Sequence, residues 1–146
     1  MSNLPIRIAP QDVIIRIRGH AVILDTDLAA LYGVTVKRLN QQTTRNRDRF
    51  PEDFCFQITE AEWRSLRLQN ATSNGRGGRR YLPYAFTEHG AIMAATVLNS
   101  PQAVQMSVAV VRAFVKLRRM ALSVESLARK VNDLERKYDK HFKVVF

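Results

Sequence analysis

The stretch DLAALYGVTVKRL, residues 27–39, predicts two short helices joined by a glycine turn. In the first helix, Leu28, Leu31 and Tyr32 follow the i, i+3, i+4 spacing that places side chains on one apolar face. Gly33 should end this helix, because glycine adopts the left-handed C-terminal cap most easily. A helix, a sharp turn and a second helix in this order are typical of a helix-turn-helix.

Both helices have recognisable N-terminal signals. Asp25 is expected to cap the first helix, because a short polar side chain can accept a hydrogen bond from the free N–H groups there. Thr35 is expected to cap the second, with Val34 and Leu39 packing across it as a hydrophobic staple. The second helix should then run to about Asn46.

The outward face of the second helix is unusually basic. The chain has no acidic residue between Asp27 and Asp48, whereas an inert solvent-facing helix usually mixes in Glu. Arginine and glutamine are side chains that hold phosphates and read base edges. The alternative is an ordinary helical hairpin within a protein core. The residues expected to contact DNA here are Lys37, Arg38, Gln41, Gln42, Arg45, Arg47 and Arg49.

Short β segments are expected around this helical pair. β-Branched and alternating residues predict a hairpin whose strands, residues 13–18 and 21–24, meet at a Gly19-His20 turn. Residues 54–58 predict another strand, in which Cys55 is a small buried hydrophobe. The expected fold class is α+β.

Two further helices carry clear start signals. Thr59 and Glu62 form a capping box, which predicts a helix from there to about Gln69. Thr87 is expected to cap another helix that ends near Leu98.

The segment between these two helices contains a Gly-, Asn- and Ser-rich loop, residues 70–80, and a short strand, residues 81–86. Pro83 would place that strand at the edge of a sheet, because proline cannot donate to the ladder. An arginine-bearing glycine loop can lie along a DNA backbone or enter a minor groove; the alternative is a solvated hairpin tip. The expected DNA contacts of this loop are Arg76, Arg79 and Arg80.

The last predicted helix begins at Ser100-Pro101 and contains no breaker, so it should run almost to the end of the chain. Apolar residues along it alternate spacings of three and four, which defines a heptad seam. β-Branched a positions with leucine at d favour a parallel two-stranded coil; the alternative is a single amphipathic helix folded back on its own domain. The seam consists of Leu117, Met120, Val124, Leu127, Val131, Leu134, Tyr138 and His141.

This pattern divides the chain into a DNA-binding domain, residues 1–116, and a coiled-coil segment, residues 117–146, that would make a homodimer. The net charge of the 146-residue chain is +10, from 23 Lys and Arg against 13 Asp and Glu. Such a chain attracts polyanions, of which nucleic acid is the commonest. The 46% hydrophobic content excludes a disordered composition, and no apolar run is long enough to span a membrane. A single cysteine fits a reducing cytoplasm, and a DNA-binding protein there would associate with the nucleoid.

Enzymatic functions find little support in the sequence. The three histidines lie far apart with no metal-ligand spacing, and no nucleophile has an evident base beside it. The acidic residues that could in principle form a nuclease metal site are better explained as helix-start and turn residues; they are Asp25, Asp27, Asp48, Glu52 and Asp53. We therefore expect no catalytic activity, no metal and no cofactor.

A series of motifs, in order along the chain, carries a family resemblance. They are Ile17-Arg18-Gly19-His20, Leu24-Asp25-Thr26-Asp27-Leu28-Ala29, Leu31-Tyr32-Gly33-Val34, Lys37-Arg38-Leu39-Asn40, Arg45-Asn46, Arg49-Phe50-Pro51-Glu52-Asp53-Phe54, Phe56-Gln57, Gly77-Gly78-Arg79-Arg80-Tyr81-Leu82-Pro83-Tyr84-Ala85-Phe86-Thr87-Glu88 and Arg112-Ala113-Phe114-Val115. Over roughly residues 13–118 the chain resembles the phage "open reading frame six" N-terminal domain, a relative of the KilA-N and Bro N-terminal domains of phages and large DNA viruses. The resemblance implies a non-catalytic DNA-binding module found in phage antirepressors and regulators.

The sequence thus predicts a homodimeric regulator of transcription that binds double-stranded DNA sequence-specifically. The main alternative is an antirepressor-like adaptor that grips another regulator protein and contacts DNA little. A third possibility is a nuclease or recombination accessory factor.

Overall fold

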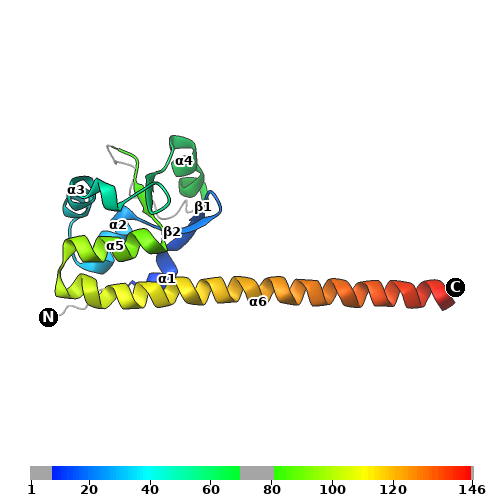
Figure 1. The fold of residues 1–146 in the computed structure, drawn as a ribbon. Helices are drawn as coiled ribbons and strands as arrows, with labels where there is room; N and C mark the ends of the chain where they lie inside the picture. Colours follow the sequence, from blue (N-terminus) through cyan, green and yellow to red (C-terminus); the bar gives the residue numbers. More distant parts are fainter. Residues whose placement is uncertain (1–7, 70–80, 146) are drawn as a thin grey trace. The chain divides into compact units, whose positions relative to one another are not determined.

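The computed structural model describes residues 8–69 and 81–145, with side chains described as far as Asp139. The chain forms two compact units, Met1–Phe114 and Val115–Phe146. The elements (Figure 1) are α1 (Pro10–Val13), β1 (Ile14–Ile17), β2 (His20–Leu24), α2 (Asp25–Tyr32), α3 (Val36–Arg45), the 3₁₀ helix η1 (Arg47–Arg49), β3 (Cys55–Gln57), α4 (Glu60–Gln69), β4 (Tyr84–Phe86), α5 (Glu88–Leu98) and α6 (Pro101–Val145). The expected α+β class and the long C-terminal helix are confirmed, whereas α1 and η1 were not anticipated.

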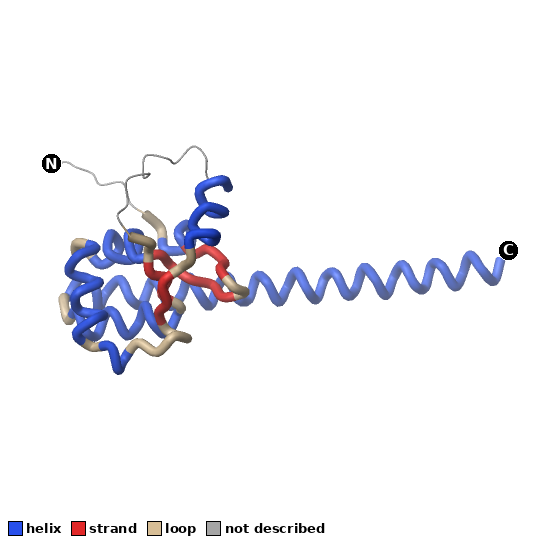
Figure 2. Tube along the Cα trace, turned by 90° about the horizontal axis from the view of Figure 1, so that it is seen from above, coloured by secondary structure: helices blue, strands red, loops and turns tan. Residues whose placement is uncertain are grey.

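The four strands form one antiparallel sheet in the order β1-β2-β4-β3. Figure 2 shows the strands together, with helices packed around them. The prediction that Pro83 marks an edge strand is wrong, because β4 lies between β2 and β3. Proline is tolerated there since the strand begins one residue later, at Tyr84, so the ladder never needs a proline N–H. The carbonyl of buried Pro83 instead accepts a hydrogen bond from the N–H of Ile58 at 3.0 Å.

The β1–β2 hairpin turns one residue earlier than predicted. Ile17 pairs with His20, which leaves Arg18 and Gly19 as the two turn residues. Their φ angles are 55° and 77°, and positive φ at both positions is the type I′ geometry that matches the twist of the strands. The Gly19-His20 assignment failed because a non-glycine residue, Arg18, adopts the left-handed conformation.

The connection from α2 to α3 forms as the sequence predicts. Gly33 has a φ of 70° and caps α2. The N–H of Gly33 donates to the carbonyl of Ala30 at 3.3 Å, and the N–H of Val34 donates to the carbonyl of Ala29 at 3.0 Å. These two bonds are the Schellman pattern that satisfies the last carbonyls of a helix. Thr35 Oγ1 accepts from the N–H of Arg38 at 3.0 Å and starts α3.

Asp25 does not cap α2, contrary to expectation. It is the first residue of the helix, Leu24 holds the N-cap position without a side-chain bond, and the Asp25 side chain is completely buried. Its carboxylate accepts hydrogen bonds from Asn40 Nδ2 and from the N–H of Tyr84, both at 3.2 Å. The carboxylate follows strand β2 directly and lies in the core beside donors from α3 and β4. A capping rule considers only neighbours in the sequence, so it does not predict these partners.

The other predicted helix starts are confirmed. Thr59 and Glu62 form a reciprocal capping box, with N–H to side-chain distances of 2.7 and 3.1 Å. Thr87 Oγ1 accepts from the N–H of Gly90 at 3.4 Å at the start of α5. Ser100 Oγ accepts from the N–H of Ala103 at 3.1 Å at the start of α6.

The sheet separates two hydrophobic clusters. Ile23 and Phe86 belong to the larger cluster, which includes buried residues of α2, α3, α5 and the beginning of α6. Their neighbours Val22 and Ala85 belong to the smaller one, against which α4 packs, because successive side chains of a strand point to opposite faces. Helix α3 is therefore held on one defined face of the sheet.

Candidate nucleic-acid interface

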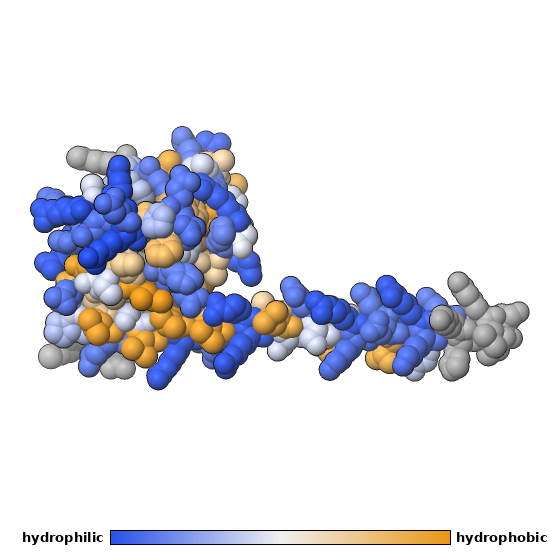
Figure 3. Space-filling model, in the orientation of Figure 1, coloured by the Kyte–Doolittle hydropathy of each residue, from blue (hydrophilic) through white to orange (hydrophobic). Residues whose placement is uncertain are grey.

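Helix α3 presents one polar face to solvent and anchors itself by the other. Leu39 is completely buried and Val36 packs partly against the larger core cluster. The side chains on the outer face are exposed, and Figure 3 shows a hydrophilic surface over the place where α3 lies in Figure 1. These exposed residues are Lys37, Arg38, Gln41 and Arg45.

The polar groups of α3 divide into satisfied and available ones. Thr43 Oγ1 donates to the Leu39 carbonyl and Thr44 Oγ1 donates to the Asn40 carbonyl, both at 2.9 Å. By contrast, the four outer side chains make no hydrogen bond or ion pair with any residue that the structure describes. They are free to donate to phosphate oxygens or to base edges.

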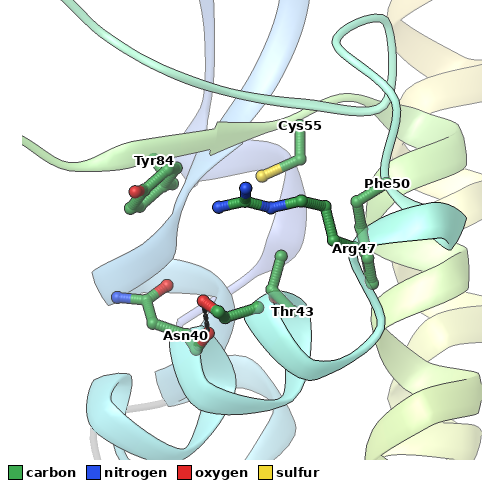
Figure 4. A pocket seen from close by; sticks show the side chains of 7 residues that line it. Asn40, Thr43, Arg47, Phe50, Cys55 and Tyr84 are labelled. Carbon is green, nitrogen blue, oxygen red and sulfur yellow. Dashed lines mark hydrogen bonds between the residues drawn. The ribbon is translucent and has the colours of Figure 1, made fainter.

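The remaining members of the predicted set do not all continue this face. Gln42 is half-buried. At Asn46 the helix ends, with Asn46 N–H and Nδ2 both donating to the Gln42 carbonyl, at 3.0 and 2.8 Å. The chain then turns into η1, where Arg47 and Arg49 are both exposed and Arg47 also lines a pocket (Figure 4). The structure thus brings Lys37, Arg38, Gln41 and Arg45 together and sets Arg47 apart.

Two groups of predicted residues lie outside the described parts of the chain. Arg76, Arg79 and Arg80 fall in residues 70–80, and the side chain of His141 lies beyond Asp139.

The other seam residues lie on one continuous helix, α6. Leu117 is half-buried, and the exposed fractions of the rest run from 45% for Val131 to 67% for Val124. From Met120 to Tyr138 the seam is an apolar stripe that no described residue of the chain covers.

Sequence reasoning missed the polar cluster under α3. Asn40 lies on the same side of the helix as Val36, Leu39 and Thr43, because residues three or four positions apart are neighbours on the surface of a helix. A polar residue on an inward stripe needs a buried partner, and that partner is Asp25. The position of Asn40 on the inward face could have indicated a buried polar contact. Its partner, Asp25, is fifteen residues away, so the local sequence does not predict it.

A second missed cluster holds the hairpin turn. The guanidinium of Arg18 donates to both carboxylate oxygens of Glu62, from Nε at 2.7 Å and from Nη2 at 3.0 Å. It also lies 4.4 Å from the ring centroid of Phe56, within the range of a cation–π contact. The Arg18 hydrogen bond, together with those from Thr59, lowers the pKa of Glu62 from 4.5 to about 2.

The buried cysteine and the remaining metal-ligand side chains form no further site among the described residues. Burial, with a smaller effect of the Asp25 charge, raises the pKa of the Cys55 thiol to about 12, and the residue is buried as expected. Within residues 8–69 and 81–139, no three His, Cys, Asp or Glu side chains gather in a way that could hold a metal ion. Across the described helices, none combines the length and apolarity that a membrane span requires.

Comparison with known protein families gives one match. The model of the ORF6N domain matches residues 12–97, a stretch that contains the whole sheet, α2, α3, α4 and nearly all of α5. Neither the curated proteins nor the solved structures contain a match. The family match agrees with the resemblance carried by the motifs of the sequence.

Proposed function

The chain belongs to the ORF6N domain family, a family of phage-type regulators, and from that premise we propose that it binds double-stranded DNA sequence-specifically through α3. In this proposal α2, the Gly33 turn and α3 act as a helix-turn-helix, and α3 enters the major groove. The groove is about 12 Å wide and admits one helix.

The observation that carries the proposal is the outer face of α3. Four exposed side chains stand on a helix fixed by a buried leucine, and none of them has a partner among the described residues. Two arginines, a lysine and a glutamine supply both the cations that neutralise phosphates and an amide that can pair with adenine. The net charge of +10 adds a long-range attraction to the same partner.

The seam on α6 supports a homodimer. The heptad spacing extends back through Ala103, Met106, Val110 and Ala113, where the stripe is buried or half-buried within the first unit. In the second unit Leu117 is half-buried, and the stripe is exposed from Met120 to Tyr138. Burying one leucine or valine contributes roughly 1.5–3 kcal/mol, so pairing with a second copy would stabilise the exposed part. Two copies would present two α3 helices to two half-sites of an operator.

Binding can be tested by fluorescence anisotropy on duplexes selected from random and genomic DNA, at several salt concentrations. The triple variant Arg38→Ala, Gln41→Ala, Arg45→Ala should lose selective binding by at least a hundredfold, because each base-reading pair contributes about 1–3 kcal/mol. The matched control removes the same residue types from exposed positions on α4, as the triple variant Arg64→Ala, Arg67→Ala, Gln69→Ala. This control should keep selective binding.

Three other results would contradict the proposal. Wild-type protein that selects no duplex at any salt concentration would exclude sequence-specific binding. Equal losses in the two triple variants would show that only net charge matters. Selective binding that survives intact in the α3 variant would favour the adaptor function, in which another regulator protein is the partner.

A further inference from the structure

A pocket of about 120 Å³ lies at the inner side of the α3 C-terminus, entirely within the first unit. It is bounded by α3, by η1 with the residue that follows it, and by the strands β3 and β4 (Figure 4). Its lining includes Asn40, Thr43, Arg47, Phe50, Cys55 and Tyr84. Nothing in the DNA-binding proposal uses this pocket.

The amide of Asn40 has a fixed orientation. Its Nδ2 donates to Asp25 Oδ2 at 3.2 Å, and the same oxygen accepts from the N–H of Tyr84 at 3.2 Å. Because an ionised carboxylate only accepts hydrogen bonds, the NH₂ group of Asn40, and not its oxygen, must face Asp25. Oδ1 therefore faces the other way, to the pocket side (Figure 4). It is buried and has no hydrogen-bond donor among the described residues. A buried acceptor left in this state costs about 1–3 kcal/mol, so the pocket lacks one N–H donor.

Arg47 brings the complementary group. Its side chain extends into the pocket in Figure 4, with the guanidinium between Tyr84 and Thr43. The guanidinium makes no hydrogen bond or ion pair with a described residue, and it carries five N–H donors. The pocket thus offers an acceptor on Asn40 and donors on Arg47, and it would be completed by a ligand with an N–H beside a C=O.

The walls set the remaining chemistry of the ligand. Phe50 and Tyr84 supply aromatic surfaces on different sides of the pocket (Figure 4), and such surfaces favour a planar ring. Because its pKa is raised to about 12, Cys55 contributes a neutral thiol. A cavity of roughly 150 Å³ holds benzene, so a partly open pocket of about 120 Å³ suits a single six-membered ring.

We propose that this pocket binds a pyrimidine base with a lactam edge, uracil or thymine, whose ring N–H donates to Asn40 Oδ1 and whose adjacent carbonyl accepts from Arg47. Arg47, as a long and mobile side chain, swings aside to admit the ring and closes over it. Cytosine lacks the ring N–H and adenine lacks the carbonyl, so both fit less well. The base has two sources: a free nucleoside, or a thymine extruded from DNA. The first source does not depend on the proposed DNA binding.

Uridine is the first probe, titrated against the full chain by calorimetry and by amide NMR shifts. Its matched control is 3-methyluridine, which replaces the ring N–H by a methyl group and keeps the ring. Uridine should bind at least tenfold more tightly than 3-methyluridine or cytidine, because the analogues leave the Asn40 acceptor unpaired. Equal binding of all three, or no binding of uridine at millimolar concentration, would overturn the proposal and leave a pocket filled by water and Arg47 only.

Two variants test the location. Thr43→Leu fills the pocket without touching the Asp25–Asn40 bond, since among the described residues the Thr43 hydroxyl bonds only to the Leu39 carbonyl. Arg47→Ala removes the donor, and Arg49→Ala is its control, an exposed arginine on the same 3₁₀ helix outside the pocket lining. Both pocket variants should lose uridine binding at least tenfold with unchanged circular dichroism, and the control should keep it. If all three variants lose uridine binding, or if none does, the proposed location of the site is wrong.

The source of the base is decided with a duplex that carries 2-aminopurine next to each thymine in turn. A fluorescence increase that wild type causes and Thr43→Leu abolishes, while anisotropy shows equal duplex binding, identifies an extruded thymine. Uridine binding without that increase identifies a free ligand. Absence of duplex binding by the wild type would contradict the proposed function alone, and the uridine titration would still decide the pocket.

Discussion

The carboxylate of Asp25 accepts a hydrogen bond from Nδ2 of Asn40 at 3.2 Å, which ties the first residue of α2 to the middle of α3. The same oxygen accepts from the N–H of Tyr84 at the start of β4, also at 3.2 Å. One buried side chain therefore fixes α3 to both its preceding helix and the central strand. Together with buried Leu39, this carboxylate holds α3 in the orientation that exposes Arg38, Gln41 and Arg45.

Replacing Asp25 with alanine should destabilise the fold strongly. The change leaves the Asn40 amide and the Tyr84 N–H buried without their acceptor, at a cost of about 1–3 kcal/mol each, so we expect a loss of roughly 2–6 kcal/mol in the free energy of unfolding. Urea denaturation followed by circular dichroism measures it. The control is Asp48→Ala, an exposed acid on η1, which should shift stability by no more than about 0.5 kcal/mol. Equal urea midpoints for the two variants would contradict the role assigned to Asp25.

The ion pair between Arg18 and Glu62 should make stability depend on pH in the acid range. The Arg18 hydrogen bond holds the pKa of Glu62 at about 2 instead of 4.5. A carboxyl group whose pKa is lower in the folded state than in the unfolded state stabilises the fold at every pH above the unfolded pKa. This contribution disappears as the pH falls from about 4.5 to about 2. Glu62→Gln should therefore have a lower Tm than wild type at pH 7, and the difference should vanish near pH 2.

Thermal unfolding between pH 2 and pH 7 gives this comparison. Glu60→Gln, on the same helix and exposed, is the control and should follow the wild-type profile. A Tm difference for Glu62→Gln that stays constant down to pH 2 would show that the loss comes from the capping box or from packing, and not from the charge.

Local sequence signals predicted most of this fold and failed at long-range contacts. The Gly33 cap and the Thr59–Glu62 capping box depend on residues a few positions apart, and they formed as expected. Asp25 was misassigned because its partners come from α3 and β4. The place of β4 in the sheet was missed because the pairing of Ile23 with Phe86 joins distant parts of the chain, and no periodicity encodes that partner.

The same distinction applies to the candidate site. Helical periodicity correctly grouped Lys37, Arg38, Gln41 and Arg45 on one exposed face. It could not extend to Arg47, because the helix ends at Arg45 and η1 changes the direction of the chain. The pocket beside Arg47 also combines residues from three separate segments, so only the folded arrangement reveals it.

The seam on α6 should hold a dimer together. Leu127→Asp with Leu134→Asp would bury four carboxylates per dimer in an apolar interface, which is strongly unfavourable. Analytical ultracentrifugation should then give the mass of one chain, whereas the wild type should give twice that mass at micromolar concentration. Ser126→Asp with Asn132→Asp adds the same charge at positions outside the seam and should remain dimeric. A wild-type protein that is monomeric at high micromolar concentration excludes this interface.

The last prediction separates base reading from charge attraction, and it concerns Gln41. A glutamine can pair with adenine through two hydrogen bonds, and such a pair discriminates by about 1–3 kcal/mol. Because Gln41 is neutral, its removal leaves the electrostatic attraction unchanged. Gln41→Ala should therefore weaken binding to the selected duplex by roughly tenfold to a hundredfold, leave nonspecific binding unchanged and keep the salt dependence.

Arg45→Ala provides the contrasting case on the same face of α3. If Arg45 holds a phosphate, its loss weakens binding to all sequences and lowers the salt slope by about 0.9 per contact. Anisotropy with duplexes that differ at one base pair at a time distinguishes the two effects, because only the Gln41 variant should lose its preference at one position. Gln69→Ala, an exposed glutamine on α4, should behave as wild type. If Gln41→Ala keeps full preference at every position of the duplex, then α3 does not read bases through Gln41, and the selectivity must come from another surface or from DNA shape.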